Sequence, residues 1–213
     1  MQKPEWYTKA QDYWNGVTAS VDGMLGGFSV LDPIDVKGSL SFVKEFNHLA
    51  GGYACDCGAG IGRVTKNFLL KVPFAKVDVV EQAPSFVEQA KADYLKREID
   101  EGKIGNLYCQ GLQDFVPEEG RYDLIWCQWV LGHLTDGLKP NGLIGVKENN
   151  ASIEQGVFDE EDSSITRPNS ELKELFKKAG LTCIKEELQK DFPQGLFPVR
   201  MYLLKPSSTS SLS

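Results

Sequence analysis

Three glycines followed by an arginine form the part of this sequence whose spacing most clearly suggests chemistry. Gly58, Gly60 and Gly62 precede Arg63 at the junction between an apolar stretch and a helical one. Such a loop predicts a nucleotide-like cofactor site. In the dinucleotide fingerprint G-x-G-x-x-G, a third glycine would stand where Arg63 stands. That difference, with Asp56 just ahead of the loop, favours S-adenosylmethionine over NAD, and an ordinary glycine turn is the alternative.

Two charged residues extend this prediction. Glu81 lies about 20 residues beyond the loop, where an acidic side chain at a strand end accepts hydrogen bonds from ribose hydroxyls. Arg63 opens the next helix, and its guanidinium fork suits a carboxylate such as that of methionine. The alternatives are a lone strand-end glutamate and a solvated helix arginine.

The elements that must position these residues alternate between helix and strand. Alternation with a glycine turn after the first strand predicts a parallel, doubly wound α/β sheet that binds its ligand above the strand C-termini. Helices are expected at 6–14, 35–48, 63–70, 84–99 and 170–179, the last capped by Ser170. Strands are expected at 54–57, 76–80, 106–110, 122–127, 143–146, 181–188 and 199–204, the last two as an antiparallel pair. Residues 16–27 and the acidic stretch 159–162 are expected as loops, residues 140–142 as a turn, and residues 207–213 as a disordered tail.

Composition narrows the function classes. A chain of 213 residues with 41% hydrophobic content predicts one domain, and a formal net charge of -7 disfavours nucleic acid and anionic membranes as partners. The five cysteines have no zinc-site spacing, so we expect no metal and reduced thiols, with Cys55 and Cys57 on opposite faces of a strand. We see no signal peptide and no apolar run of roughly 20 residues, which predicts a soluble intracellular protein.

Several longer strings carry a family resemblance. The motifs DGMLGG (22–27), DCGAGIGR (56–63) and QWVLGHL (128–134), with Tyr13-Trp14 and the segments 111–115 and 159–164, resemble the alpha N-terminal protein methyltransferases. The resemblance runs from about residue 6 to 206. It implies a class I methyltransferase-like fold in a single domain, 1–206, whose residues 1–50 form a helical and lid extension over the site.

The resemblance also implies a cofactor, a substrate class and a set of site residues. The cofactor would be S-adenosylmethionine, with S-adenosylhomocysteine as product, and the substrates would be proteins with Xaa-Pro-Lys N-termini, ribosomal proteins among them. A monomer in the cytoplasm, with the nucleus as a second location, is expected. The cofactor residues would be Gly58, Gly60, Arg63, Glu81, Gln82, Ala83, Leu112, Gln113 and Gln128, with the last three around adenine. The peptide channel would comprise Trp14, Leu25, Trp129, Asp159 and Ser164, and the catalytic residues would be Asp162, His133 and Asn149.

These last residues match what the chemistry needs. A protein α-amino group has a pKa of about 7.7 to 8.0, so a proton must be removed before the amine can attack a methyl group. We expect His133 and Asp162 to accept that proton and Asn149 to orient the amine. A proline-stiffened N-terminus suits a channel walled by Trp14 and Trp129, and core packing is the alternative for these tryptophans. Asp159, assisted by Ser164, would contact a third-position lysine.

One segment departs from the family pattern. Between Asp136 and Gly137 the family carries about a dozen further residues that form a helix, so a crossover here would have to use residues 129–134. Three functions therefore stay open. They are an N-terminal protein methyltransferase, a small-molecule methyltransferase of the same fold, and an inactive cofactor-binding protein with a shortened crossover.

Overall fold

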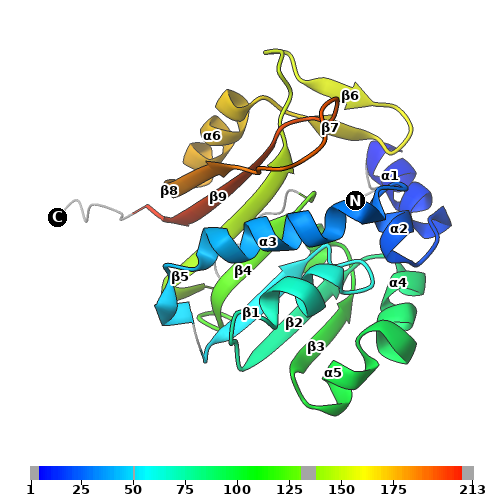
Figure 1. Cartoon of the computed structure of the whole chain (residues 1–213), viewed down its shortest axis with the longest axis vertical. Coiled ribbons are helices and arrows are strands. Elements are labelled where there is room, and N and C mark those ends of the chain that lie inside the picture. Colours follow the sequence, from blue (N-terminus) through cyan, green and yellow to red (C-terminus); the bar gives the residue numbers. More distant parts are fainter. Residues whose placement is uncertain (1–4, 50, 131–137, 208–213) are drawn as a thin grey trace.

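A seven-stranded sheet forms the centre of the protein. The computed structural model describes residues 5–49, 51–130 and 138–207. Within this part of the chain the strand order is β3-β2-β1-β4-β5-β9-β8 (Figure 1). The strands are β1 (Tyr53–Cys57), β2 (Lys76–Glu81), β3 (Ile104–Cys109), β4 (Tyr122–Gln128), β5 (Leu138–Asn149), β8 (Leu181–Leu188) and β9 (Val199–Pro206). The pairs among β1 to β5 are parallel, whereas β9 runs antiparallel to both β5 and β8. The predicted fold class is therefore confirmed.

Helices cover both faces of the sheet. The α-helices are α1 (Glu5–Gly16), α2 (Val21–Met24), α3 (Asp32–Val43), α4 (Pro84–Gln89), α5 (Lys96–Asp100) and α6 (Asn169–Lys178). Short 3-10 turns span Ser29–Leu31, Asn47–Leu49 and Leu112–Asp114, and π-helical segments span Thr65–Leu69 and Ala90–Tyr94. Figure 1 shows α3 crossing in front of the sheet, and α6 beside β8 and β9.

The central strands are buried on both faces, as parallel sheets require. On one face, Phe42 of α3, Phe68 and Trp126 share an apolar cluster, and the rings of Phe68 and Trp126 meet edge to face at 4.7 Å. On the other face, Phe176 of α6 packs on Tyr202 of β9 at 5.2 Å. The two clusters hold the strands between the helices. Because the strands β1 to β5 are parallel, the loops that follow them lie together at the carboxyl-terminal edge of the sheet.

Several local predictions need correction. The expected helix 63–70 is π-helical over Thr65–Leu69, and the expected helix 84–99 is interrupted at Ala90–Tyr94. The turn at 140–142 is wrong, because β5 already begins at Leu138 and absorbs these residues in a register shift against β4. Ser170 is not the N-cap of α6, since the cap residue is Pro168 and no side chain caps the helix.

The acidic stretch also contains structure that the sequence did not reveal. A separate antiparallel hairpin pairs β6 (Val157–Asp159) with β7 (Ser164–Thr166). Each strand has three residues, too few for an alternating pattern to stand out. The hairpin lies above the C-terminal end of β5 and close to α1 (Figure 1). The expected acidic loop is thus the turn of a hairpin.

The connection between β4 and β5 is short, as the sequence predicted. Residues 131–137 lie outside the described part of the chain, and with them His133. Trp129 has φ +55°, so a helix does not begin there, and the idea that residues 129–134 form a complete crossover helix is wrong at its first residue. A side chain in the left-handed region is unfavourable in a helix, because Cβ then crowds the neighbouring carbonyl.

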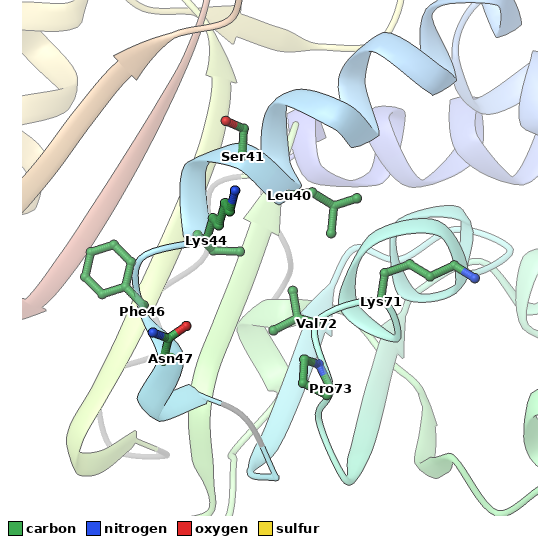
Figure 2. A pocket seen from close by; sticks show the side chains of 9 residues that line it. Leu40, Ser41, Lys44, Phe46, Asn47, Lys71, Val72 and Pro73 are labelled. Carbon is green, nitrogen blue, oxygen red and sulfur yellow. The ribbon is translucent and has the colours of Figure 1, made fainter.

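A groove of about 540 Å³ opens at the opposite edge of the sheet. Its lining includes Leu40 of α3, Lys44 directly after α3, and Val72 and Pro73, which precede β2 (Figure 2). The parallel strands begin at this edge, so the groove lies far from the glycine loop, which follows the end of β1.

Among the helices of the described ranges, none has the length and the hydropathy that a membrane span requires.

Candidate active site

The glycine loop adopts the backbone that a tight cofactor turn needs. Gly58, Gly60 and Gly62 have φ values of +70°, +58° and +92°, a region that side chains other than glycine avoid. The loop is tied to the neighbouring strand, because the N–H groups of Gly58 and Ala59 donate to the Val80 carbonyl at 2.9 and 3.1 Å. A Cβ at Gly58 or Gly60 would also collide with Val130 or Met24, respectively.

Glu81 lies where a ribose-binding acid is expected. Its residue is 7% exposed, and its carboxylate accepts hydrogen bonds from the N–H groups of Gly60 and Ala83, both at 2.8 Å. Burial raises the pKa of Glu81, and these backbone bonds act against that rise. The carboxylate thus joins the glycine loop to the end of β2. A left-handed glycine loop with an acid at the next strand end fits S-adenosylmethionine.

Asp56, in β1 just before the glycine loop, bonds to a residue just after the loop. It is 1% exposed, and its Oδ2 accepts a hydrogen bond of 2.6 Å from the Thr65 hydroxyl. Burial raises its pKa to about 6, although the Thr65 bond and the charge of Arg63 lower it. Asp56 therefore holds the start of the following helix rather than presenting itself to a ligand.

Arg63 is 3% exposed and held by two carboxylates of α3. Its Nη1 donates to Asp32 Oδ1 at 2.6 Å and to Asp35 Oδ2 at 2.8 Å. The Trp129 ring lies over the guanidinium, with 5.6 Å from Cζ to the ring centroid. The charge of Asp35 raises the pKa of Arg63 against the effect of burial, so the group stays cationic. Arg63, expected to bind the cofactor, thus contacts Trp129, which is expected to line the peptide channel.

The other expected cofactor residues lie after β2, after β3 and at the end of β4. Gln82 and Ala83 follow Glu81 directly, and Leu112 and Gln113 form a short 3-10 turn after β3. Leu112 packs against the cluster on the α6 face of the sheet. Gln128 instead lies on the α3 face, where its amide donates to Asp35 at 2.9 Å and accepts from Trp126 at 3.1 Å. A place for Gln128 beside adenine stays a prediction.

The N-terminal helices pack against the glycine loop. Trp14 of α1 and Met24 of α2 join an apolar cluster with Ile61 of the loop and Phe86 of α4. The Met24 sulfur accepts a hydrogen bond from the Ile61 N–H at 3.2 Å. Leu25, half-buried, ends α2 beside Met24. Trp14 and Met24 are therefore brought to the cofactor loop from a distant part of the sequence, and a place for Leu25 in the peptide channel stays a prediction.

The acidic turn between β6 and β7 is more exposed than the buried residues around the glycine loop. Asp159 is exposed and Asp162 half-buried, and their hydrogen bonds within the described chain go to backbone N–H groups of the same turn, Glu161 at 2.8 Å and Ser164 at 2.9 Å. Burial raises the pKa of Tyr13 in α1, and the negative charges of this turn raise it further. The turn is negative and open to solvent.

Asn149 and Trp129 lie on neighbouring strand ends. Asn149 ends β5, and the Trp129 N–H donates to the Lys147 carbonyl at 2.9 Å, which places the tryptophan beside that strand. The Trp129 Nε1 is buried without a partner in the described structure. A buried donor with nothing to bond is unfavourable, so it suits a site that a ligand completes.

The residues that support Arg63 are not evident from the sequence pattern. Asp32 and Asp35 were hidden because acids in the first turn of a helix are common. Lys147 gave a signal, since a lysine inside an apolar strand needs a buried partner. The expectation for Cys55 and Cys57 was wrong as well, because residues two apart on a strand share a face, and their sulfurs lie 3.8 Å apart. Both thiols are free and buried, and burial raises the pKa of Cys57, so it is a poor nucleophile.

Metal ligands are not clustered in the described chain, where no group of three His, Cys, Asp or Glu side chains could hold an ion. The geometry instead combines a buried cofactor cradle with an exposed acidic turn. Helix α1 lies between the two, since it packs on the glycine loop through Trp14 and lies close to the hairpin (Figure 1).

Comparison with known proteins agrees with this geometry. Residues 2–205 match the model of the AdoMet-dependent proline di-methyltransferase family. The chain is 44% identical to alpha N-terminal protein methyltransferase 1 of Schizosaccharomyces pombe, covering 98% of this chain and 100% of that one. It is 42% identical to N-terminal Xaa-Pro-Lys N-methyltransferase 1 of Xenopus tropicalis, covering 94% and 96% of the two chains.

A solved structure gives the same result. A S-adenosylmethionine-dependent methyltransferase of Leishmania major superposes with a TM-score of 0.85 at 37% identity, covering 94% of this chain and 83% of that one. The alignment with the S. pombe relative spans 227 positions, more than the 213 residues here, so that relative carries residues that this chain lacks. The chain belongs to the AdoMet-dependent proline di-methyltransferase family.

Proposed function

We propose that the protein transfers methyl groups from S-adenosylmethionine to the α-amino group of protein N-termini of the Xaa-Pro-Lys type. The observation that carries this proposal is the family match over residues 2–205, together with relatives named for this activity. The site supports it, because a cofactor cradle and an acidic turn lie at the same edge of the sheet. A small-molecule methyltransferase would not need the acidic turn.

The cofactor end is held by this chain's buried residues. Glu81 would bind the ribose hydroxyls and Arg63 the carboxylate, and the absence of side chains at Gly58 and Gly60 would let the nucleoside approach the backbone closely. When bound, the cofactor supplies a methyl group activated on a sulfonium. The N-terminal helices would act as a lid, because Met24 and Trp14 already pack on the glycine loop.

The acceptor end removes a proton and positions the amine. Asp162, which is half-buried, would accept the proton of the substrate ammonium, with His133 as a second acceptor. Asn149 would orient the amine through its side-chain oxygen. Trp129 and Trp14 would wall the entry for a proline-stiffened chain, which loses little entropy on binding.

The acidic turn would select the third substrate residue. Asp159 is exposed, and the whole turn from 159 to 162 carries four acidic side chains. A lysine or arginine at the third position of the substrate would pair with Asp159, and Ser164 would add a hydrogen bond. Ribosomal proteins as substrates, the monomeric state and a cytoplasmic location stay predictions.

The test uses peptides that begin Ser-Pro-Lys or Ala-Pro-Lys, incubated with the protein and S-adenosylmethionine. We expect mass spectrometry to find added methyl groups on peptides with a free amino terminus and none on N-acetylated copies. Methylation of acetylated peptides would contradict the proposal. Binding of S-adenosylhomocysteine without turnover would instead support an inactive cofactor-binding protein.

A further inference from the structure

Three charged side chains are buried together next to the glycine loop, and a fourth borders them. Asp35 and Lys147 are 1% and 0% exposed and Arg63 is 3% exposed, whereas the side chain of Asp32 is 19% exposed. Asp35 lies at the centre. Its Oδ2 is 2.8 Å from Arg63 Nη1, its Oδ1 is 2.6 Å from Lys147 Nζ, and it also accepts the Gln128 amide. Two anions and two cations balance each other at this point.

Lys147 is enclosed on every side by acceptors. Beyond Asp35 Oδ1, its ammonium donates to the Asp35 carbonyl at 3.0 Å, Ser39 Oγ at 3.0 Å and Gln189 Oε1 at 2.8 Å. The packing is tight, since a Cβ on Gly38 would collide with the Gln189 amide. Buried ion pairs of this kind are often no more stabilising than apolar side chains of the same volume. Stability alone is therefore a poor explanation for the cluster.

The geometry at Arg63 offers a functional explanation. Nη1 carries the bonds to both aspartates, whereas Nε and Nη2 make no hydrogen bond to any described residue. Cζ of Arg63 also lies over the Trp129 ring, 5.6 Å from its centroid. The fork is thus held by the aspartates on one side and contacted by the ring, and its remaining N–H groups are left for a planar bidentate partner such as a carboxylate.

We propose that Asp35, itself anchored by Lys147, is a positioning residue that orients Arg63 toward the carboxylate of the cofactor. This inference rests on the proposed function. The contribution of Asp35 to cofactor binding cannot come from its charge, because a negative charge next to Arg63 repels the carboxylate of the cofactor. If Asp35 only neutralised Arg63, removing its charge would strengthen carboxylate binding; if it orients the fork, removing it weakens that binding.

The test compares two ligands that differ in the amino acid end. S-adenosylhomocysteine carries the carboxylate, and methylthioadenosine lacks the amino acid moiety. We expect Asp35→Asn to weaken S-adenosylhomocysteine by about 10-fold or more in calorimetry and to leave methylthioadenosine unchanged, as losing a hydrogen bond to a charged group predicts. The double variant Asp35→Asn/Lys147→Met keeps the charge balance of the cluster and should show the same selective loss.

Asp78→Asn is the matched control. Asp78 is a second fully buried carboxylate paired with an arginine, Arg121 Nε at 2.8 Å, but it lies outside the cluster. It should lower thermal stability without changing the ratio of the two affinities. Equal weakening of both ligands, or tighter S-adenosylhomocysteine binding, in both cluster variants would overturn the inference. Failure of the unaltered protein to bind S-adenosylhomocysteine would overturn the proposed function instead.

Discussion

The glycine loop and the acidic turn of the β6–β7 hairpin lie at the same edge of the molecule but hold their side chains by different means. Glu81 and Arg63 are buried, and each is bonded to groups from other elements. Asp159 and Asp162 bond to backbone within their own turn. The fold therefore prepares the cofactor end before any ligand arrives, whereas the acceptor end depends on what the substrate brings.

The same difference decides which mutations affect which step. Changes in the acidic turn should alter turnover or substrate choice while cofactor binding stays intact. Changes in the glycine loop region should alter cofactor binding first. Three substitutions separate these effects and a fourth tests stability where the two regions border each other, in order of decreasing size.

The largest effect is expected for Asp162→Asn. The amide keeps an oxygen for the Ser164 N–H but cannot accept the substrate proton, so kcat should fall by about 100-fold or more. Stopped assays with a Ser-Pro-Lys peptide measure this, and S-adenosylhomocysteine affinity should not change. Glu160→Gln in the same exposed turn is the control. Unchanged turnover of Asp162→Asn would remove Asp162 from the catalytic residues.

Glu81→Gln should weaken S-adenosylhomocysteine by roughly 10- to 100-fold. The amide can accept from Gly60 or Ala83 but not from both, because its nitrogen is itself a donor. Calorimetry gives the affinity, with Glu88→Gln on the exposed face of α4 as the control. A variant that binds the ligand as tightly as the unaltered protein would contradict the assignment of Glu81.

Asp159→Lys should reduce the preference for Ser-Pro-Lys over Ser-Pro-Gln peptides by about 10-fold, as expected for the loss of a partly exposed charge pair. The ratio of kcat/KM values for the two peptides measures it. Glu160→Lys makes the same charge change one residue away and should have the smaller effect. Equal effects of both variants would show that the turn acts by net charge alone.

The smallest effect is expected on the pH dependence of stability at Glu148, which lies next to the predicted catalytic residue Asn149. Glu148 precedes Asn149, its Oε1 is buried without a described partner, and burial raises its pKa from 4.5 to about 8. The fold thus favours the protonated acid, and the stability it contributes is complete below pH 4.5 and lost as the pH rises through 8.

Glu148→Gln stays neutral at every pH. It should match the unaltered protein at pH 5 and exceed it at pH 8, by on the order of 2 kcal/mol in the free energy of unfolding. Urea denaturation at the two pH values measures this. An equal difference between the two proteins at both pH values would mean that Glu148 ionises normally.

How far the sequence predicts this molecule depends on the distance between the contacts. The glycine loop, Glu81 and the strands were predicted because each is a local pattern within a few residues. The Arg63 support was missed because it joins distant segments, with Lys147 and Asp35 separated by 112 positions. The hairpin was missed because its strands are short, and the crossover prediction was wrong at Trp129 because a left-handed φ leaves no pattern in residue types.

The most direct single measurement locates the transferred methyl group. The protein is incubated with methyl-labelled S-adenosylmethionine and a Ser-Pro-Lys peptide, and tandem mass spectrometry assigns the label to an atom. We expect it on the α-amino nitrogen. Label on the lysine side chain, or no label while S-adenosylhomocysteine still binds, would contradict the proposed activity.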